Sequence, residues 1–276
     1  MQQFQGHSNE VVFHLAQTRK RPGHTEPVFR HEDAAERTFF ETLNQSLNRL
    51  PLDWQEECYT ALRSFIVRNP LLLQLDLDTF RRSYTQFRPD KLLQELYVKG
   101  EDALHLRMQP GQCRRCGALA NLASKPAICS NRVCRMEGTI EADAMSLEAL
   151  STYRVASSWA MDFWIAPGFH EVALYDALEG RERSLYPARD AADISLEDVS
   201  VGIDVKTYAS PYLLGQHLQH AGLGRLARYA RRIIAYPDVF EQRRPAYRRI
   251  LMDSAGPITN EAEFKPVSEV IEEFAA

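Results

Sequence analysis

The sequence predicts a mixed α/β protein in which a helical N-terminal part and a small four-cysteine module precede a C-terminal domain built around a mixed sheet. Three patterns predict this class. Apolar residues recur at helical spacing up to about residue 99, four cysteines fall within 22 residues, and short β-branched runs alternate with helical ones after residue 146. The expected segments are a loose arm over 1–30, a helical domain over 31–105, a zinc module over 106–142 and an α/β domain over 143–276.

Composition and charge limit what the chain can be. With 276 residues, of which 45% are hydrophobic, it can bury a sizeable core in one or two domains. The formal net charge of −4 gives no overall signal for nucleic-acid binding. The start, MQQFQGHSNE, is polar with no apolar segment behind it, and no run is long enough to span a bilayer. We therefore expect a cytoplasmic protein with no membrane association.

The N-terminal region shows no pattern typical of a catalytic site. Residues 1–30 mix polar residues with Gly and Pro and have no periodicity, which predicts the loose arm. Beyond them apolar residues step by four, as in Ala35, Phe39, Leu43 and Leu47. Proline-containing breaks at 69–70 and 88–90 divide this region into three or four helices. Their expected role is packing or contact with a partner.

Four of the five cysteines form two closely spaced pairs. The first pair has C-x2-C spacing and the second C-x4-C spacing; the four residues are Cys113, Cys116, Cys129 and Cys134. Short-spaced pairs of this kind supply the four thiolates that tetrahedral Zn²⁺ prefers, while disulfides fit poorly with a cytoplasmic chain. A closed four-cysteine site leaves no open coordination position, so we expect a structural zinc ion. The fifth cysteine, Cys58, is expected to be a buried apolar residue.

The C-terminal segment predicts alternating helices and strands. Residues 146–164 are expected to form one amphipathic helix capped by Ser146, followed by a break at 166–168 and a second helix over 169–180. Two or three short strands are expected within 183–208, with a turn near 196–198. A helix over 211–235, a strand over 248–255 and a terminal helix from 266 complete the expected order.

One of these strands carries a charged pair on one face. In VSVGIDVKTY, residues 199–208, side chains alternate between the two faces, so Asp204 and Lys206 point the same way while the valines and Ile203 point the other. On its own this pair is more typical of a surface ion pair than of a functional site. Its neighbours along the chain decide between the two interpretations.

Two further acids are expected near this strand. A hairpin turning near residue 197 brings Asp193, from the preceding strand, toward Asp204 and Lys206. Glu171 lies on the apolar side of the helix before it, where a carboxylate is costly unless it binds a cation or is hydrogen-bonded. Glu171 can equally serve the helix dipole, and Asp190 and Asp198 remain alternatives for the second acid.

Acids in this order with a lysine suit metal-dependent phosphodiester hydrolysis. Carboxylate oxygens hold Mg²⁺ and leave coordination positions for water and phosphate. Glu171, Asp193 and Asp204 are therefore predicted metal ligands, and Lys206 is predicted to position the attacking water and to offset charge that builds on the phosphate.

Arginines mark candidate nucleic-acid contacts. Eight lie between residues 225 and 249, while the last two dozen residues are mainly acidic among their charges. A basic helix gives salt-sensitive binding to phosphates without base specificity, although a solvated helix face explains it equally well. The candidates on this helix are Arg225, Arg228, Arg231 and Arg232, and the candidates in the cysteine module are Arg114 and Arg115.

These motifs resemble the PD-(D/E)xK nuclease superfamily, which has the restriction-endonuclease-like fold. GFHEVALYDAL, with Glu171, is similar to its first helix, and PARDAADI, with Asp193, to its second strand. GIDVK matches its signature strand, and Gln216 falls where many members place a further polar residue. An Ala-Asp pair replaces the family's Pro-Asp. The resemblance covers residues 165–235.

The whole layout is also similar to the restriction-endonuclease-like protein associated with prokaryotic PIWI-type proteins. This resemblance implies a Mg²⁺-dependent DNA endonuclease in defence against phage or plasmid DNA, acting beside a PIWI-type protein and a helicase. A non-catalytic zinc-containing adaptor and an RNA-cutting nuclease are the alternatives. The sequence leaves open whether the protein forms a homodimer.

Overall fold

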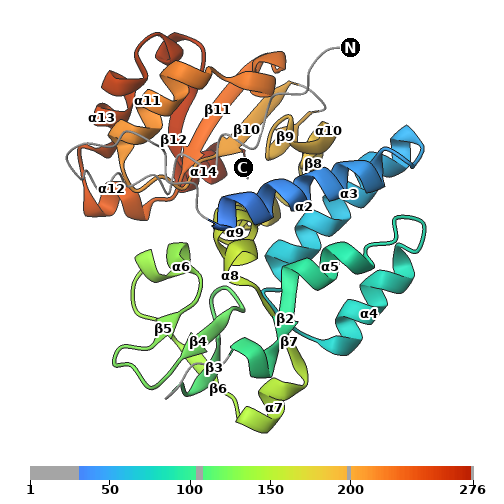
Figure 1. Ribbon diagram of the computed structural model, residues 1–276. Coiled ribbons are helices and arrows are strands. Elements are labelled where there is room, and N and C mark those ends of the chain that lie inside the picture. The colour runs from blue at the N-terminus through green and yellow to red at the C-terminus, as the bar shows by residue number, and fades with distance from the viewer. Residues whose placement is uncertain (1–30, 104–107, 198–199, 275–276) are drawn as a thin grey trace, which may run out of the picture.

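The computed structural model describes residues 31–103, 108–197 and 200–274. Over these residues the protein is a mixed α/β structure in which helices surround sheets of three, five and four strands (Figure 1). The expected arm over 1–30 lies outside the described residues. Within the described ranges, no helix is both long and apolar enough to cross a membrane.

The helical N-terminal region forms much as the sequence predicts. Its helices are α2 (His31–Leu47), α3 (Leu52–Arg68), α4 (Gln74–Ser83) and α5 (Asp90–Leu96), followed by the short 3₁₀ turn η1 (Gly100–Ala103). Two strands that the sequence did not predict lie between and after them, β1 (Leu71–Leu73) and β2 (Tyr97–Lys99). The four-residue apolar periodicity of α2 has its expected effect, because Phe39, Leu43 and Leu47 are fully buried.

The predicted single helix over 146–164 is wrong. Ser146 does cap a helix, α7 (Leu147–Ser151), by accepting a hydrogen bond from the backbone N–H of Ala149. The chain then enters β7 (Tyr153–Ala156), which pairs antiparallel with both β1 and β2 and forms the centre of the three-stranded sheet. Strand partners from earlier in the chain thus override the local helical pattern.

A four-stranded sheet carries the cysteine module, with strand order β5-β4-β3-β6. Its elements are β3 (Pro110–Cys113), β4 (Leu119–Asn121), β5 (Ile128–Cys129), α6 (Arg132–Met136) and β6 (Ala142–Ala144). β6 crosses the expected border between the module and the C-terminal domain, and β7 pairs with strands of the helical region. The domain boundaries themselves remain predictions.

The C-terminal region is built on a five-stranded mixed sheet of order β12-β11-β10-β9-β8. β10, β11 and β12 run parallel, and β9 pairs antiparallel with β10 and β8. The strands are β8 (Arg183–Leu185), β9 (Ile194–Leu196), β10 (Val201–Val205), β11 (Arg231–Tyr236) and β12 (Glu263–Pro266). This sheet confirms the predicted strands within 183–208 and the turn near residue 197.

Helices cover both faces of this sheet. α9 (Ala166–Ala177) and α14 (Val267–Phe274) pack on the face that bears Ile203, and α11 (Pro211–Ala221) and α13 (Tyr247–Ala255) contribute to the core on the opposite face. The remaining elements are α8 (Ser158–Ala160), the π-helical turn η2 (Met161–Ile165), α10 (Pro187–Asp190), η3 (Gly224–Arg228), α12 (Val239–Arg243) and η4 (Gly256–Asn260).

Three expectations for this region are wrong. The expected break at 166–168 is absent, since η2 runs directly into α9 and Pro167 lies in the first turn of that helix. The expected helix over 211–235 ends at Ala221, and residues 231–236 form β11, whose apolar end is buried on both faces as in a central parallel strand. The expected strand over 248–255 lies within helix α13.

One apolar cluster joins all three parts of the chain. It includes Phe39 of α2, Leu62 of α3, Cys134 of the cysteine module and Ile203 of β10. Helix α9 contacts α3, α6, β10 and α14, so it lies where the three parts meet (Figure 1). A side chain on α9 can therefore be positioned by residues far away in the sequence.

The tight packing of α11 against α13 gives a stability prediction. A Cβ added at Gly215 would lie 2.4 Å from Cβ of Ser254 and 2.8 Å from backbone atoms of α13. Gly215→Ala is therefore expected to lower the free energy of unfolding by about 1–3 kcal/mol, although alanine is the better helix former by about 1 kcal/mol. His220→Ala, at an exposed site of the same helix, is the control and should change it by less than about 0.5 kcal/mol. Chemical denaturation of both variants measures the effect, and a more stable Gly215→Ala protein would contradict the packing.

Candidate active site and metal centre

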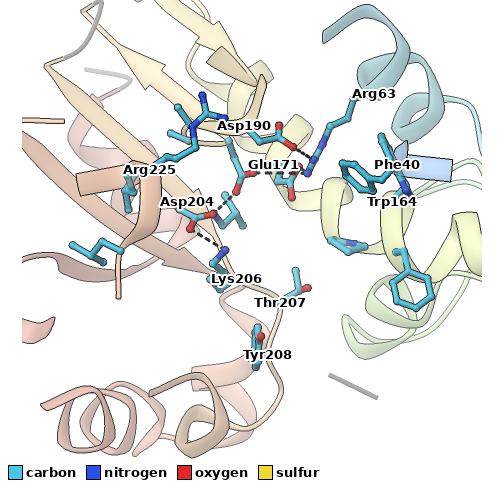
Figure 2. Close-up of a pocket in the computed structure, with 18 of the residues that line it drawn as sticks. Phe40, Arg63, Trp164, Glu171, Asp190, Asp204, Lys206, Thr207, Tyr208 and Arg225 are labelled. Carbon is cyan, nitrogen blue, oxygen red and sulfur yellow. Dashed lines mark hydrogen bonds and ion pairs between the residues drawn. The ribbon is translucent and has the colours of Figure 1, made fainter. Parts of the chain in front are cut away.

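A cavity of about 130 Å³ lies between α3, the start of α9 and the ends of β9 and β10 (Figure 2). Its polar side chains come from separate elements and its other wall is aromatic, with Phe40, Phe163 and Trp164. The charged groups that pair directly across the cavity are Arg63, Glu171, Asp190, Asp193, Asp204 and Lys206. All four residues predicted for catalysis therefore line one cavity.

The antiparallel pairing of β9 and β10 places Asp193 beside Asp204. The register pairs Ile194 with Ile203. Because the strands are antiparallel, Asp193, one residue before Ile194, lies opposite Asp204, one residue after Ile203. Directly opposed residues have Cβ atoms about 5 Å apart, so the two carboxylates are neighbours. The backbone N–H of Val205 donates to Oδ2 of Asp193 at 2.6 Å, which fixes the orientation of this side chain.

Lys206 follows directly after β10 and pairs with the second of these acids. Its Nζ lies 2.8 Å from Oδ2 of Asp204 (Figure 2). Both side chains are partly open to solvent, 12% exposed for the lysine and 20% for the aspartate, while Asp193 and Glu171 are buried. Among the three predicted metal ligands and Lys206, solvent therefore reaches the side that carries Asp204 and Lys206.

Glu171 and Asp190 line the same cavity. Glu171 is on the buried side of α9, as its apolar helical neighbours predict, and is only 2% exposed. Asp190 ends a segment in which Tyr186, Ala188, Arg189 and Asp190 all have positive φ. Backbone strain of this kind persists where surrounding contacts hold it, and it is common at functional sites.

Arg63 of helix α3 is a charged residue of this cavity that the sequence did not predict. Its guanidinium group lies 3.0 Å from Glu171 and 3.9 Å from Asp193, and it donates a short hydrogen bond to Asp190. A signal was present, because Arg63 follows Leu62 on a helix face whose other residues, such as Ile66, are buried. The acids that it binds are more than a hundred residues away, so they could not be identified from local sequence pattern.

Burial and like charge make these carboxylates poor acids. Burial raises the pKa of Asp193 well above its usual range, and repulsion from Glu171 and Asp204 raises it further, against the opposing effect of Lys206 and Arg63. Burial likewise raises the pKa of Glu171, although Arg63 opposes the shift. Acids held in this state favour binding of a cation.

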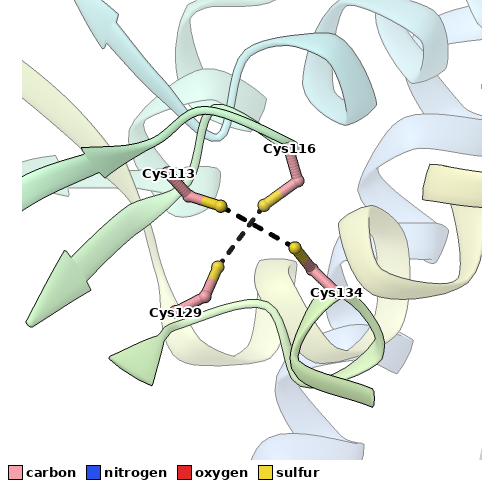
Figure 3. Close-up of side chains that lie close together, drawn as sticks. All are labelled: Cys113, Cys116, Cys129 and Cys134. Atoms are coloured by element: carbon pink, nitrogen blue, oxygen red, sulfur yellow. Dashed lines mark hydrogen bonds between the residues drawn. The ribbon is translucent and has the colours of Figure 1, made fainter. Parts of the chain in front are cut away.

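The four cysteines form a second, separate cluster. Their Sγ atoms all lie within 4.8 Å of one another, with Cys113–Cys134 at 3.7 Å and Cys116–Cys129 at 3.4 Å (Figure 3). Ligands about 2.3 Å from a tetrahedral zinc ion lie about 3.8 Å apart, whereas a disulfide needs about 2.05 Å. The cluster therefore has the spacing of a metal site, and all four thiols are free. These thiolates can hold a metal such as zinc.

Local structure presents these thiols toward one another. Gly117, with φ of +72°, allows the tight turn after the first pair, and its N–H donates to the carbonyl oxygen of Cys113. Asn131 caps α6 by accepting from the N–H groups of Val133 and Cys134. A turn and a helix start thus aim the two pairs at a common point.

The cysteine module is fastened to the helix that carries Glu171. Nε2 of His170, the residue before Glu171, lies 3.0 Å from Oε1 of Glu137, which follows α6. Arg132 of α6 also lies 3.7 Å from Asp162 in η2. These two contacts, together with the packing of α6 on α9, connect the module to the start of α9.

The arginines predicted to bind nucleic acid are not on one helix. Arg225 and Arg228 lie on η3 and are exposed, whereas Arg231 and Arg232 are on strand β11. Arg225 lines the cavity but donates to the carbonyl oxygens of residues 188 and 189. The predicted four-arginine helix is wrong because the chain turns into a strand after residue 230.

Most of the other predicted contacts have partners within the chain. Arg231 pairs with Glu263 and Glu273, and Arg232 donates to backbone carbonyls. In the module the exposed Arg114 pairs with Asp143, while Arg115 donates to the carbonyl oxygen of Cys134. Gln216 donates to the hydroxyl group of Tyr212 and does not line the cavity.

Comparison with known protein families bears on the C-terminal region. Residues 168–275 match a family model described as REase associating with pPIWI_RE. This segment is similar to that family. The matched segment includes α9 from Gly168 onward and all five strands of the C-terminal sheet, and hence Glu171, Asp193, Asp204 and Lys206, but neither Arg63 nor the cysteines. Comparison with curated proteins and with solved structures gave no match.

The cysteine cluster predicts zinc in the purified protein. Protein prepared without chelators is expected to contain about one equivalent of zinc by elemental analysis, and Cys129→Ser is expected to lower this content. Zinc removal should also lower the melting temperature, because the module shares the core that holds α9. Cys58→Ser, outside the cluster, is the control for zinc content. Less than about half an equivalent in the wild type would contradict the assignment.

The raised pKa of Asp193 predicts how stability depends on pH. An acid with a raised pKa in the folded state binds protons more tightly there than in the unfolded chain. The free energy of unfolding therefore falls as pH rises from about 4, the usual Asp value, toward the raised value, by about 1.4 kcal/mol per pKa unit.

Asp193→Asn is expected to remove this fall. Without added divalent metal the variant should melt at a higher temperature than the wild type at pH 8, with the difference shrinking toward pH 4. Thermal melts at several pH values measure it. Asp176→Asn, on the exposed side of α9, is the control. Equal or lower stability of Asp193→Asn at pH 8 would show that this carboxylate is not strained by its neighbours.

Proposed function

We propose that the protein is a Mg²⁺-dependent endonuclease that hydrolyses DNA phosphodiester bonds in prokaryotic defence. The observation that carries this proposal is the pairing of β9 and β10, which sets Asp193 opposite Asp204 with Lys206 at the accessible side. The REase family of residues 168–275 supports a nuclease, and the same order of acids and lysine supports the restriction-endonuclease-like core.

The side chains of the cavity fit a hard divalent cation. Asp193, Asp204 and Glu171 offer carboxylate oxygens, which are the ligands that Mg²⁺ prefers. When Asp190 is included, four carboxylates and the cations Arg63 and Lys206 form the directly paired group, which has two negative charges in excess when fully ionised. Arg132 and Arg225 also line the cavity, but they contact Asp162 and backbone carbonyl oxygens and not these acids. A bound Mg²⁺ would balance this charge and supply polarisation of the phosphate and of a water molecule.

Lys206 has the position needed to act on the attacking water. Its ammonium group is held by Asp204 at the solvent-accessible side of the acids, so it can orient a water molecule and offset the charge of a phosphate entering the cavity. Burial of the strand's other face supports this role. Val201, Ile203 and Val205 anchor β10 in the core and limit the movement of the two charged side chains.

The family description also supports a partner. The printed name links the family to pPIWI_RE, so we propose that the protein acts beside a PIWI-type protein and, by the same resemblance, a helicase. Arg225 at the cavity wall and the exposed Arg228 are the proposed contacts to the DNA backbone. RNA in place of DNA is an outcome that the same cleavage assay can reveal when an RNA substrate is added beside the plasmid.

One observation favours a second candidate function, a non-catalytic adaptor that docks DNA or protein. Arg63 already pairs with Glu171 and Asp190, so part of the acid group is neutralised within the chain. An adaptor would keep such pairs for stability. An adaptor would not need the ammonium group of Lys206 beside Asp204, whereas a nuclease would need it to orient the attacking water.

Plasmid cleavage separates these candidates. The wild type is expected to nick supercoiled plasmid with Mg²⁺, tested alone and with its PIWI-type partner, and Lys206→Ala and Asp204→Ala are each expected to reduce the rate at least about 100-fold, as loss of a positioned acid–base group does. Lys99→Ala, an exposed lysine paired with Glu101, is the control and should cut normally. Equal cutting by all variants, or no cutting of plasmid by the wild type under any of these conditions, would refute the DNA endonuclease.

A further inference from the structure

The helical region contributes a side chain to the acid group of the C-terminal domain. Arg63 extends from α3 into the cavity and is 15% exposed, and the acids it contacts lie on α9, at the end of α10 and just before β9 (Figure 2). The residues matched by the family model begin at 168, so this contact comes from outside the matched segment. The acid group is thus incomplete without the N-terminal part.

The guanidinium group of Arg63 is held from several sides. It stacks over the ring of Tyr186, with 4.3 Å from Cζ to the centroid, and lies 5.8 Å from that of Trp164. One nitrogen lies 3.0 Å from Glu171, and the other donates to Asp190 and lies 3.3 Å from the hydroxyl of Tyr59. If Arg63 had to leave the cavity before a metal could bind, we would expect fewer contacts to hold its guanidinium group. The contacts observed therefore favour a role in which Arg63 stays in place.

The same contacts restrain the backbone that leads to Asp193. Tyr59 and Arg63 both donate to Asp190, the last of four residues with positive φ in the segment 186–190. Arg225 adds hydrogen bonds to two carbonyl oxygens of that segment. The strained segment ends three residues before Asp193, so its restraint sets where β9 begins and where the Asp193 carboxylate points.

We propose that Arg63 is a positioning residue of the nuclease site. It binds Glu171 and Asp190 and so holds the 186–190 segment, which leaves Asp193 and Asp204, beside Lys206, as the acids directed at the divalent metal. This inference rests on the proposed function and refines it. Glu171 then contributes by holding Arg63, while Asp193 and Asp204 face the metal. It also makes α3 and the C-terminal sheet a single working unit.

Metal binding tests this role apart from cleavage. Mn²⁺ binding to the full-length protein is measured from the electron paramagnetic resonance signal of free Mn²⁺, together with a thermal melt and the plasmid assay. Arg63→Ala is expected to raise the Kd for Mn²⁺ at least about tenfold and to slow cleavage in parallel. Arg63→Lys is expected not to restore binding, since an ammonium group cannot bridge two carboxylates as the planar guanidinium does.

Arg68→Ala is the matched control. Arg68 lies on the same helix and makes a two-point contact with Asp176 of α9, but on the exposed side away from the cavity. It is expected to leave the Kd and the cleavage rate unchanged. If Arg63→Ala does not fold, Asp190→Asn replaces it, because this change weakens the hold on the segment and keeps the contact of Arg63 with Glu171; it is expected to raise the Kd several-fold.

The outcomes separate this inference from the nuclease proposal. Mn²⁺ binding by Arg63→Ala that equals or exceeds the wild type would overturn the positioning role and make Arg63 a competitor of the metal. Full restoration by Arg63→Lys would overturn it too, since charge alone would then suffice, and so would an unchanged Kd in Asp190→Asn. A wild type that binds no Mn²⁺ also overturns it. A wild type that binds Mn²⁺ but cuts no DNA refutes the nuclease and leaves the Kd comparison to decide the role of Arg63.

Discussion

Repulsion among carboxylates in one partly buried cavity is the constraint on which the architecture depends. Burial and like charge raise the pKa values of Asp193 and Glu171, so keeping these groups close together costs folding free energy. Antiparallel register, the N–H of Val205 and the cations Arg63 and Lys206 hold them in place. Carboxylates that are kept close together at a cost in folding free energy are typical of a site for binding or chemistry.

The position of α9 explains why the chain needs its other parts. This helix carries Glu171, and it packs between α3 of the helical region, α6 of the cysteine module and β10 of the sheet. The apolar cluster that includes Phe39, Cys134 and Ile203 is continuous across these contacts. The helical region and the cysteine module thus act as supports on two sides of the helix, and neither is an appendage to the C-terminal sheet.

The sequence predicted the features that depend on local pattern. Alternation in β10 and the hairpin before it brought Asp193 to Asp204, and cysteine spacing predicted the thiol cluster. What it missed depends on partners distant in the chain. β7 is a strand because β1 and β2 flank it, and the role of Arg63 depends on acids more than a hundred residues later. Periodicity carries no information about such contacts.

The cluster of arginines after residue 225 suggested a nucleic-acid contact, but in the structure part of it forms ion pairs within the chain. Two arginines of the basic run pair with the acidic C-terminal stretch, Arg231 with Glu263 and Glu273 and Arg248 with Glu269. These pairs fasten β11, β12, α13 and α14 together, so those arginines are used within the fold. Arg225 of η3, before this paired region, lines the cavity. Under the proposed function, contact with a nucleic-acid backbone is therefore best sought at the cavity mouth, where a phosphate would meet Lys206.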